Sequence, residues 1–285
     1  MVGGRGMLGT DLVERLRGSG VPVTAVGSAE LDIRDADACG AAVRGHAVVV
    51  NCAAWTAVDD AEQSEADAFA VNAVGAANLA RAAAREGARL VHISTDYVFD
   101  GAASAPYAED APPAPRSAYG RTKAAGEWAV RAEHDDALVV RTAWLYGRHG
   151  RCFPRTIAGA LTQRDLLDVV ADQVGQPTWT VDVADLVVRL VDAGAPAGTY
   201  HATSQGVASW HEFAQAVAQE QGLDPARVRE TTSEAYRRPA PRPAYSVLGH
   251  DALRAAGVEP IGDWRERFSV AAPVVLGADV GVAAR

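Results

Sequence analysis

The chain has 285 residues, 48% of them hydrophobic, and a formal net charge of −9 at pH 7. This length and composition allow a large core, and the acidic balance disfavours a surface that follows nucleic-acid phosphates. No apolar run approaches the roughly 20 residues that span a bilayer, no secretory leader is visible, and the scattered Cys39, Cys52 and Cys152 lack metal-ligand spacing. The sequence therefore predicts a cytoplasmic protein with no membrane segment, nucleic-acid partner or metal.

A glycine-rich motif begins the chain. Gly3, Gly6 and Gly9 have the G-x-x-G-x-x-G spacing of a dinucleotide-binding loop, in which the backbone approaches a pyrophosphate and the next helix points its N-terminus at the anion. The alternative is a glycine-rich coil. Only Met1 and Val2 precede the loop, whereas such a loop follows a full strand. We therefore expect either that the native chain begins upstream of Met1 or that the sheet has a shortened central strand.

The residues after the second expected strand indicate the cofactor. Sites that prefer NAD place an acid near this strand end to bind the ribose 2′-hydroxyl, but Gly27 and Ser28 stand here and Arg5 lies in the glycine loop. This combination leaves room and charge for a 2′-phosphate, so NADPH is the predicted cofactor, with NADH still possible. Asp32 has two interpretations, one as a neighbour of the adenine and one as a helix cap.

Small residues follow the next apolar strand, at 47–50. Ala53, Ala54 and Thr56 would allow a cofactor to lie against the backbone at the carboxyl end of a parallel sheet. Ordinary tight packing is the alternative. The strand at 89–94 ends in a similar position, where the hydroxyl of Thr95 is suited to bind a substrate carbonyl. A Ser/Thr turn that closes the strand would use the same residue.

Tyr119 and Lys123 form the strongest chemical signal. They are four residues apart, so on a helix both side chains project from one face. An ammonium beside a phenol favours phenolate, so we expect Lys123 to lower the pKa of Tyr119 from about 10 and make it a proton donor. A Y-x-x-x-K pair alone is usually a solvated surface pair. The glycine loop and the strand that leads to Thr95 favour the catalytic interpretation.

Strands and helices alternate along the first two thirds of the chain, which predicts an α/β fold with a doubly wound parallel sheet. The expected strands are 21–26, 47–50, 89–94, 138–143, 166–170 and 198–202. The expected helices are 8–17, 64–87, 119–134, 151–163, 182–193 and 210–221. After Trp264 the chain is rich in alanine, valine and glycine, so we expect it to fray.

These motifs, in this order, resemble the dTDP-4-dehydrorhamnose reductase family of the extended short-chain dehydrogenases/reductases. The resemblance is most specific in the segments 94–101 and 119–123, and it runs to about Trp264. The family fold would be a Rossmann-type domain with a smaller C-terminal substrate-binding lobe. The implied division is 1–145 and 168–195 for the dinucleotide-binding domain, 146–167 and 196–270 for the lobe, and 271–285 for a tail.

The resemblance implies reduction of the C4 ketone of a dTDP-linked 4-keto-6-deoxysugar by NADPH, in rhamnose or antibiotic deoxysugar biosynthesis. Its implied catalytic residues are Thr95, Tyr119 and Lys123. Tyr119 and Lys123 also belong to the expected cofactor site, together with Gly3, Arg5, Gly6, Met7, Leu8, Gly9, Ser28, Asp32, Ile33, Ala53, Ala54 and Thr56. The expected sugar site contains Val58, Thr95, Tyr97, Tyr119 and Trp144. A homodimer is possible.

Two other functions stay open. A non-catalytic homologue could bind NADP and regulate a partner enzyme, but the presence of Thr95, Tyr119 and Lys123 speaks against it. A nucleotide-sugar epimerase or dehydratase of the same superfamily would keep its NAD bound and regenerate it. Consumption of NADPH would distinguish the reductase from both.

Overall fold

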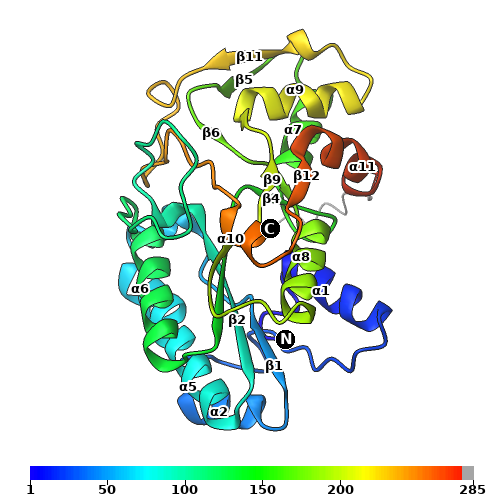
Figure 1. The fold of residues 1–285 in the computed structure, drawn as a ribbon. Coiled ribbons are helices and arrows are strands. Elements are labelled where there is room, and N and C mark those ends of the chain that lie inside the picture. Colours follow the sequence, from blue (N-terminus) through cyan, green and yellow to red (C-terminus); the bar gives the residue numbers. More distant parts are fainter. Residues whose placement is uncertain (278–285) are drawn as a thin grey trace.

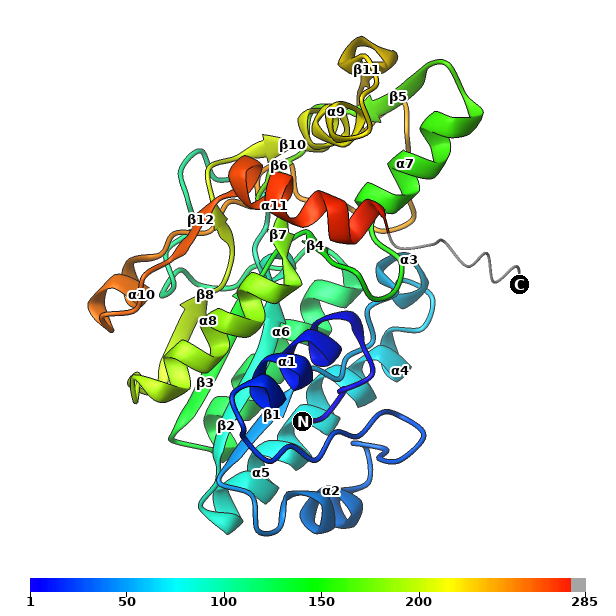
Figure 2. The same ribbon diagram turned by 90° about the vertical axis from the view of Figure 1, so that its right-hand side faces the viewer.

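A computed structural model describes residues 1–277 of the chain. A parallel sheet of four strands forms its centre, in the order β1-β2-β3-β8. These strands are β1 (Val48–Asn51), β2 (Arg89–Thr95), β3 (Ala137–Thr142) and β8 (Gly198–His201). Helices cover both faces, as Figure 1 and Figure 2 show. The predicted doubly wound α/β fold is therefore confirmed.

Side chains alternate between the two faces of the sheet. Val50, Val91 and Leu138 pack on α1 (Met7–Gly18) and α8 (Thr180–Asp192). Val49 and Leu90 belong to the opposite core, with α2 (Ala36–Val43), α5 (Ala76–Glu86) and α6 (Ala118–Glu133). Neighbouring valines and leucines in one strand thus face opposite layers, which explains why these strands are continuous apolar runs.

The first strand is reduced to Val2. Its N–H donates to the Val50 carbonyl at 2.9 Å, its carbonyl accepts from Cys52 N, and it bridges Val26 on the other side. The predicted strand at 21–26 is wrong as a regular element, because only Val26 forms a parallel bridge there. The stub still lies between two neighbours, so it directs the glycine loop as a longer strand would.

A smaller lobe packs at the carboxyl end of the sheet (Figure 1). Its core centres on Phe213, with Tyr146, Trp264 and Phe268 around it. Its helices are α7 (Phe153–Gln163), α9 (Trp210–Glu220) and α11 (Trp264–Leu276), and its short strand pairs are β5 (Leu167–Val170) with β11 (Val228–Thr231), and β6 (Val174–Gly175) with β10 (Ala208–Ser209). Two further pairs are β4 (Leu145–Tyr146) with β7 (Thr178–Trp179), and β9 (Ser204–Gln205) with β12 (Ile261–Asp263).

Two parts of the division inferred from the sequence need correction. The segment from 168 to 175 belongs to the lobe, since β5 pairs with β11 and β6 with β10. Strand β8 lies in the main sheet beside β3, and Leu253 of α10 (Asp251–Ala255) packs into the same core. Strand pairing decides membership here, and the sequence pattern does not reveal which strands pair.

The expected fraying after Trp264 is wrong for residues 264–276. These residues form α11, which buries Phe268, Ala271 and Val275 against the lobe. The rest of the predicted tail, 278–285, lies outside the described residues. Between residues 1 and 277, no helix combines the length and hydropathy needed to cross a membrane.

Candidate active site

Two adjoining cavities open where the carboxyl ends of the strands meet the lobe. The first has a volume of about 440 Å³ and contains Gly3, Gly6, Met7, Leu8, Gly9, Ala54, Thr56, Val58, Thr95, Tyr97, Tyr119, Lys123 and Trp144. The second, of about 580 Å³, adds Arg5, Ser28, Asp32, Ile33 and Ala53, and it shares Gly3, Gly6 and Ala54 with the first. The structure thus brings together every residue that the sequence nominated. Their individual roles stay predictions.

The glycine loop has the shape that a pyrophosphate requires. Gly3 has φ 72°, and a Cβ there would lie 2.6 Å from Ala53 N; a Cβ on Gly9 would lie 2.1 Å from the Gly3 carbonyl oxygen. Both positions therefore need glycine. Helix α1 starts at Met7, directly after Gly6, with neither a side-chain cap nor an acid in its first turn. Its first N–H groups thus remain available to an anion, so this end of the cavities fits a dinucleotide.

Arg5 lines the second cavity, but its guanidinium already has a partner. Its guanidinium pairs with Glu30, whose Oε2 also accepts from Gly27 N at 2.8 Å. The sequence interpretation found no acid at Gly27 or Ser28 and missed that Glu30 reaches back to this point. The carboxylate of Glu30 would repel a 2′-phosphate. The preference for NADPH or NADH therefore depends on whether Arg5 pairs with Glu30 or with that phosphate.

Asp32 is not a helix cap. The N-cap of α2 is Asp35, whose side chain accepts from the N–H groups of Asp37 and Ala38. Asp32 instead accepts from Arg34, through both its backbone N–H and its guanidinium. These hydrogen bonds lower the pKa of Asp32 to about 2. The carboxylate therefore stays ionised beside the expected adenine position.

A buried asparagine connects two segments that line the cavities. Asn72 lies in η1 (Ala70–Gly75), a π-helical turn between α4 (Glu65–Phe69) and α5. Its side chain accepts from Trp55 N at 2.8 Å and donates to the Trp55 carbonyl at 3.1 Å and to Thr122 Oγ1 at 3.0 Å. The segment after β1 is therefore tied to α6, the helix that carries Tyr119. Such π-helical turns occur often at functional sites.

Tyr119 lies in the first turn of α6, which Ser117 caps by accepting from Gly120 N. Its ring packs edge-on against Tyr97, with centroids 5.6 Å apart. Burial raises the pKa of Tyr119 to about 12, and the Thr95 hydroxyl only partly offsets this effect. The expected lowering of this pKa by Lys123 is thus wrong for this structure. Tyr119 stays protonated at neutral pH, as a proton donor must.

The geometry of Lys123 explains that correction. Its Nζ donates to the Ile93 carbonyl at 2.6 Å, so its charge interacts with a strand end and not with the phenol. Burial lowers the pKa of Lys123 to about 8, and the carboxylate of Glu127 partly offsets this shift. The ammonium is therefore present at neutral pH and is lost in mildly alkaline solution.

Thr95 is the last residue of β2, and its hydroxyl already has hydrogen-bond partners. Its Oγ1 donates to Asp96 Oδ1 at 3.0 Å and accepts from Tyr97 N at 3.3 Å. Burial raises the pKa of Asp96 to about 6, so this acceptor is ionised at neutral pH. Thr95 must turn its hydroxyl away from Asp96 before it can donate to a substrate carbonyl. The sequence interpretation did not assign Asp96, although it adjoins Thr95.

We predict that kcat/KM falls as the pH rises above about 8. The pKa of Lys123 is lowered from 10.5 to about 8 in the free protein, so the cation predominates below this pH and is lost progressively above it. The measurement is kcat/KM between pH 6 and 10 at saturating cofactor. A profile that stays flat to pH 10 would contradict a role for the Lys123 cation.

Basic residues from the lobe approach the cavity rim. Arg242 Nη2 lies 3.0 Å from Asp59 Oδ1, and Arg238 Nη1 lies 3.9 Å from the other oxygen. Asp59 belongs to α3 (Val58–Ala61), next to the cavity residue Val58. The segment from 237 to 243 is therefore tied to α3 by one carboxylate.

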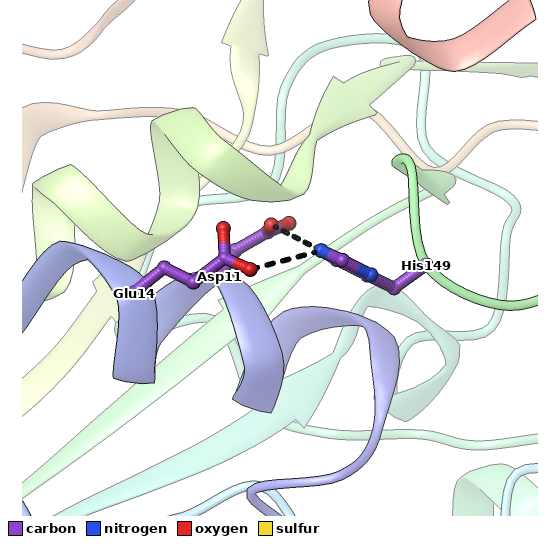
Figure 3. Close-up of side chains that lie close together, drawn as sticks. All are labelled: Asp11, Glu14 and His149. Carbon is purple, nitrogen blue, oxygen red and sulfur yellow. Dashed lines mark ion pairs between the residues drawn. The ribbon is translucent and has the colours of Figure 1, made fainter. Parts of the chain in front are cut away.

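Figure 3 shows a further polar cluster, formed by Asp11, Glu14 and His149. His149 Nε2 lies 3.5 Å from Asp11 Oδ1 and 3.5 Å from Glu14 Oε1. These side chains are ligand types that divalent cations accept, but none of them lines either cavity. The two positions in α1 and the one after β4 are distant in sequence, so no spacing rule reveals the cluster. The absence of a catalytic metal remains a prediction.

Comparisons with known proteins agree over nearly the whole chain. The family described as RmlD substrate binding domain matches residues 1–273. The chain is 51% identical to a probable dTDP-4,6-dihydroxy-2-methyloxan-3-one 4-ketoreductase of Streptomyces antibioticus, covering 98% of this chain and 96% of the relative. It is 49% identical to a dTDP-4-keto-6-deoxy-D-glucose reductase of Streptomyces niveus, covering 98% and 97%. A crystal structure of dTDP-4-dehydrorhamnose reductase from Bacillus anthracis in complex with NADP is 36% identical, covers 95% and 96%, and has a TM-score of 0.91.

Proposed function

The chain belongs to the RmlD substrate binding domain family, that of the dTDP-4-dehydrorhamnose reductases, and from this membership we propose how it acts. It is an oxidoreductase that uses NADPH to reduce the C4 ketone of a dTDP-4-keto-6-deoxyhexose. The observation that carries this function is one cavity that contains the glycine loop, Tyr119 and Lys123. The cofactor loop and the proton donor therefore meet in one space.

The residues of the chain would then divide the work as follows. NADPH, when bound, supplies the hydride to the carbonyl carbon. The carbonyl oxygen becomes negative as the hydride arrives, and Tyr119 gives it the proton of its hydroxyl. Thr95, once turned from Asp96, donates a hydrogen bond to the same oxygen. Lys123 would hold the ribose next to the nicotinamide.

The hexose itself would lie against Val58, Tyr97 and Trp144, which line the cavity next to Tyr119. An indole and a phenol offer flat apolar faces to a sugar ring and polar groups at its edge. The particular deoxysugar can be identified from the reaction products.

We also propose a cytoplasmic location and a homodimer. Sedimentation of the purified protein tests the homodimer.

Incubation with NADPH and a panel of dTDP-4-keto-6-deoxyhexoses tests the function. We expect absorbance at 340 nm to fall in proportion to the alcohol formed at C4, and the configuration of the product identifies the pathway. An epimerase or dehydratase would convert the sugar without net oxidation of NADPH. A regulatory subunit would bind NADPH and leave the sugar unchanged. Either result would refute the reductase.

We predict that Arg5→Ala weakens NADPH binding about 10-fold, whereas NADH affinity changes little. The reason is that only NADPH carries a 2′-phosphate to which the guanidinium can donate two hydrogen bonds. Titration of cofactor fluorescence measures both dissociation constants. Equal weakening of both cofactors would show that Arg5 only supports the fold.

Glu30→Gln is the matched test of the same contact. Removal of the carboxylate that now pairs with Arg5 should strengthen NADPH binding, because a 2′-phosphate no longer competes with a negative charge. Arg229→Ala is the control for Arg5→Ala, because it also removes an arginine from an ion pair. Arg229 pairs with Asp168 in the lobe and lies in neither cavity. Any change in NADPH affinity in the control would indicate a general effect of charge.

A further inference from the structure

Trp144 has an unusual backbone conformation. Among residues 1–277 it is the one residue other than glycine with positive φ, at 47°. A bulky side chain rarely adopts this left-handed region, and residues that do so cluster at sites where a side chain must be held in one place. Trp144 lies two residues after the end of β3 and lines the cavity that contains Thr95 and Tyr119. The strained residue therefore lies in the wall of the same cavity as Thr95 and Tyr119.

Two lobe residues fix its indole. The ring of Trp210 stacks on that of Trp144, with centroids 3.6 Å apart and planes 5° from parallel. Aromatic pairs prefer an offset stack or an edge-to-face contact, so this nearly eclipsed stack is imposed by its surroundings. A Cβ on Gly175 would lie 2.5 Å from Trp144 Cε2. Glycine at 175 thus leaves the space that the indole occupies.

Trp210 is itself held firmly. It is the first residue of α9, where Ser209 and Glu212 form a capping box. Its Nε1 donates to Gln173 Oε1 at 3.1 Å, and Gln173 Nε2 donates to Ser233 Oγ at 2.8 Å. Its other neighbour is the ring of Phe153, 4.5 Å away between centroids. Trp210 is thus part of the lobe framework and not a mobile surface residue.

We propose that Trp210 is a positioning residue that holds Trp144 as the wall of the hexose site and thereby decides how strongly the protein distinguishes a dTDP-hexose from dTDP. This inference rests on the proposed function. The stack fixes the indole of Trp144 from the lobe side, so a sugar meets a preformed surface of the cavity. The nucleotide alone does not use that face. Loss of the stack therefore weakens hexose recognition selectively.

Trp210→Leu tests the proposal, with Trp210→Phe as the conservative variant. We expect Trp210→Leu to weaken binding of a dTDP-6-deoxyhexose about 10-fold, with the dissociation constants of dTDP and NADPH unchanged. Trp210→Phe restores much of this loss because a phenyl ring still stacks. Gly175→Ala places a methyl group against the indole of Trp144 and displaces it. It should therefore weaken hexose binding in the same selective way. Trp128→Phe is the control, since Trp128 is 59% exposed on α6 and lies in neither cavity.

Circular dichroism tests the stack itself without substrate. Two indoles at this distance couple electronically, so the wild type should show a paired positive and negative band that Trp210→Leu abolishes and Trp128→Phe retains. Equal weakening of dTDP and dTDP-hexose in Trp210→Leu, or unchanged affinity for both, would overturn the proposal and leave the proposed function intact. A wild-type protein that binds NADPH but no dTDP-sugar would overturn both.

Discussion

Tyr119→Phe should lower kcat by about 10²- to 10⁴-fold, the range that general acid catalysis typically contributes. The variant removes one hydroxyl and retains the ring that packs against Tyr97. Because the pKa of Tyr119 is raised to about 12, the hydroxyl carries its proton throughout the working range, in the same cavity as Thr95. NADPH affinity and Tm should change little.

Tyr200→Phe is the matched control for this variant. Tyr200 in β8 donates its hydroxyl to the Pro196 carbonyl at 2.7 Å and lies in neither cavity. Its loss costs one hydrogen bond and leaves turnover near that of the wild type. Turnover of Tyr119→Phe within a few-fold of the wild type would remove Tyr119 from the mechanism and direct attention to Asp96, the buried acid next to Thr95.

Glu127→Gln should destabilise the fold by about 3–5 kcal/mol, the usual cost of removing one partner from a buried ion pair. Glu127 and Arg141 are 0% and 1% exposed, and their side chains share two hydrogen bonds of 2.8 and 2.7 Å. Ser94 Oγ donates to the same carboxylate at 2.6 Å. The substitution leaves a buried guanidinium without its counter-ion. We expect Tm to fall by roughly 5–15 °C.

Glu133→Gln, on the same helix, is the control for Glu127→Gln. It removes a carboxylate from an exposed ion pair and so shows how much of the stability loss is due to burial. Glu133 also meets an arginine with two contacts, but this pair with Arg81 lies at the surface, where water screens the charges. Its Tm should therefore stay close to that of the wild type. Equal Tm values for the two variants would show that the buried pair does not stabilise the fold.

Glu127→Gln should also shift the alkaline fall in kcat/KM to lower pH, because Glu127 raises the pKa of Lys123.

Most regular elements near the site were predictable because their signals are local. The apolar runs that became β2 and β3, and the Tyr119 helix, start and end close to the predicted residues. The helix after Trp264 was missed although its buried residues, Phe268 and Val275 among them, recur at helical spacing. Its alanine and valine content suggested disorder only because the lobe that it packs against was not yet known. Tertiary packing decided that segment.

The site was predictable in its membership and less so in its electrostatics. Residues at strand ends and in the glycine loop converge because parallel strands place their carboxyl ends together. The pKa of Tyr119 is raised because its side chain is buried and because the Lys123 ammonium donates to the Ile93 carbonyl. Neither fact follows from the four-residue spacing of Tyr119 and Lys123. Trp144 and Trp210 are 66 positions apart in the sequence, and only the fold of the lobe brings their rings together. No local sequence pattern predicts this stack.

Transfer of deuterium from [4-²H]NADPH tests the central claim most directly. The nicotinamide would carry the label on the face that donates the hydride, and the product would be isolated after one turnover with a dTDP-4-keto-6-deoxyhexose. The proposed function predicts one deuterium at C4 of the hexose for each NADPH oxidised, with the hydroxyl proton taken from solvent through Tyr119. Product without deuterium at C4, or sugar conversion that leaves the labelled NADPH intact, would contradict it.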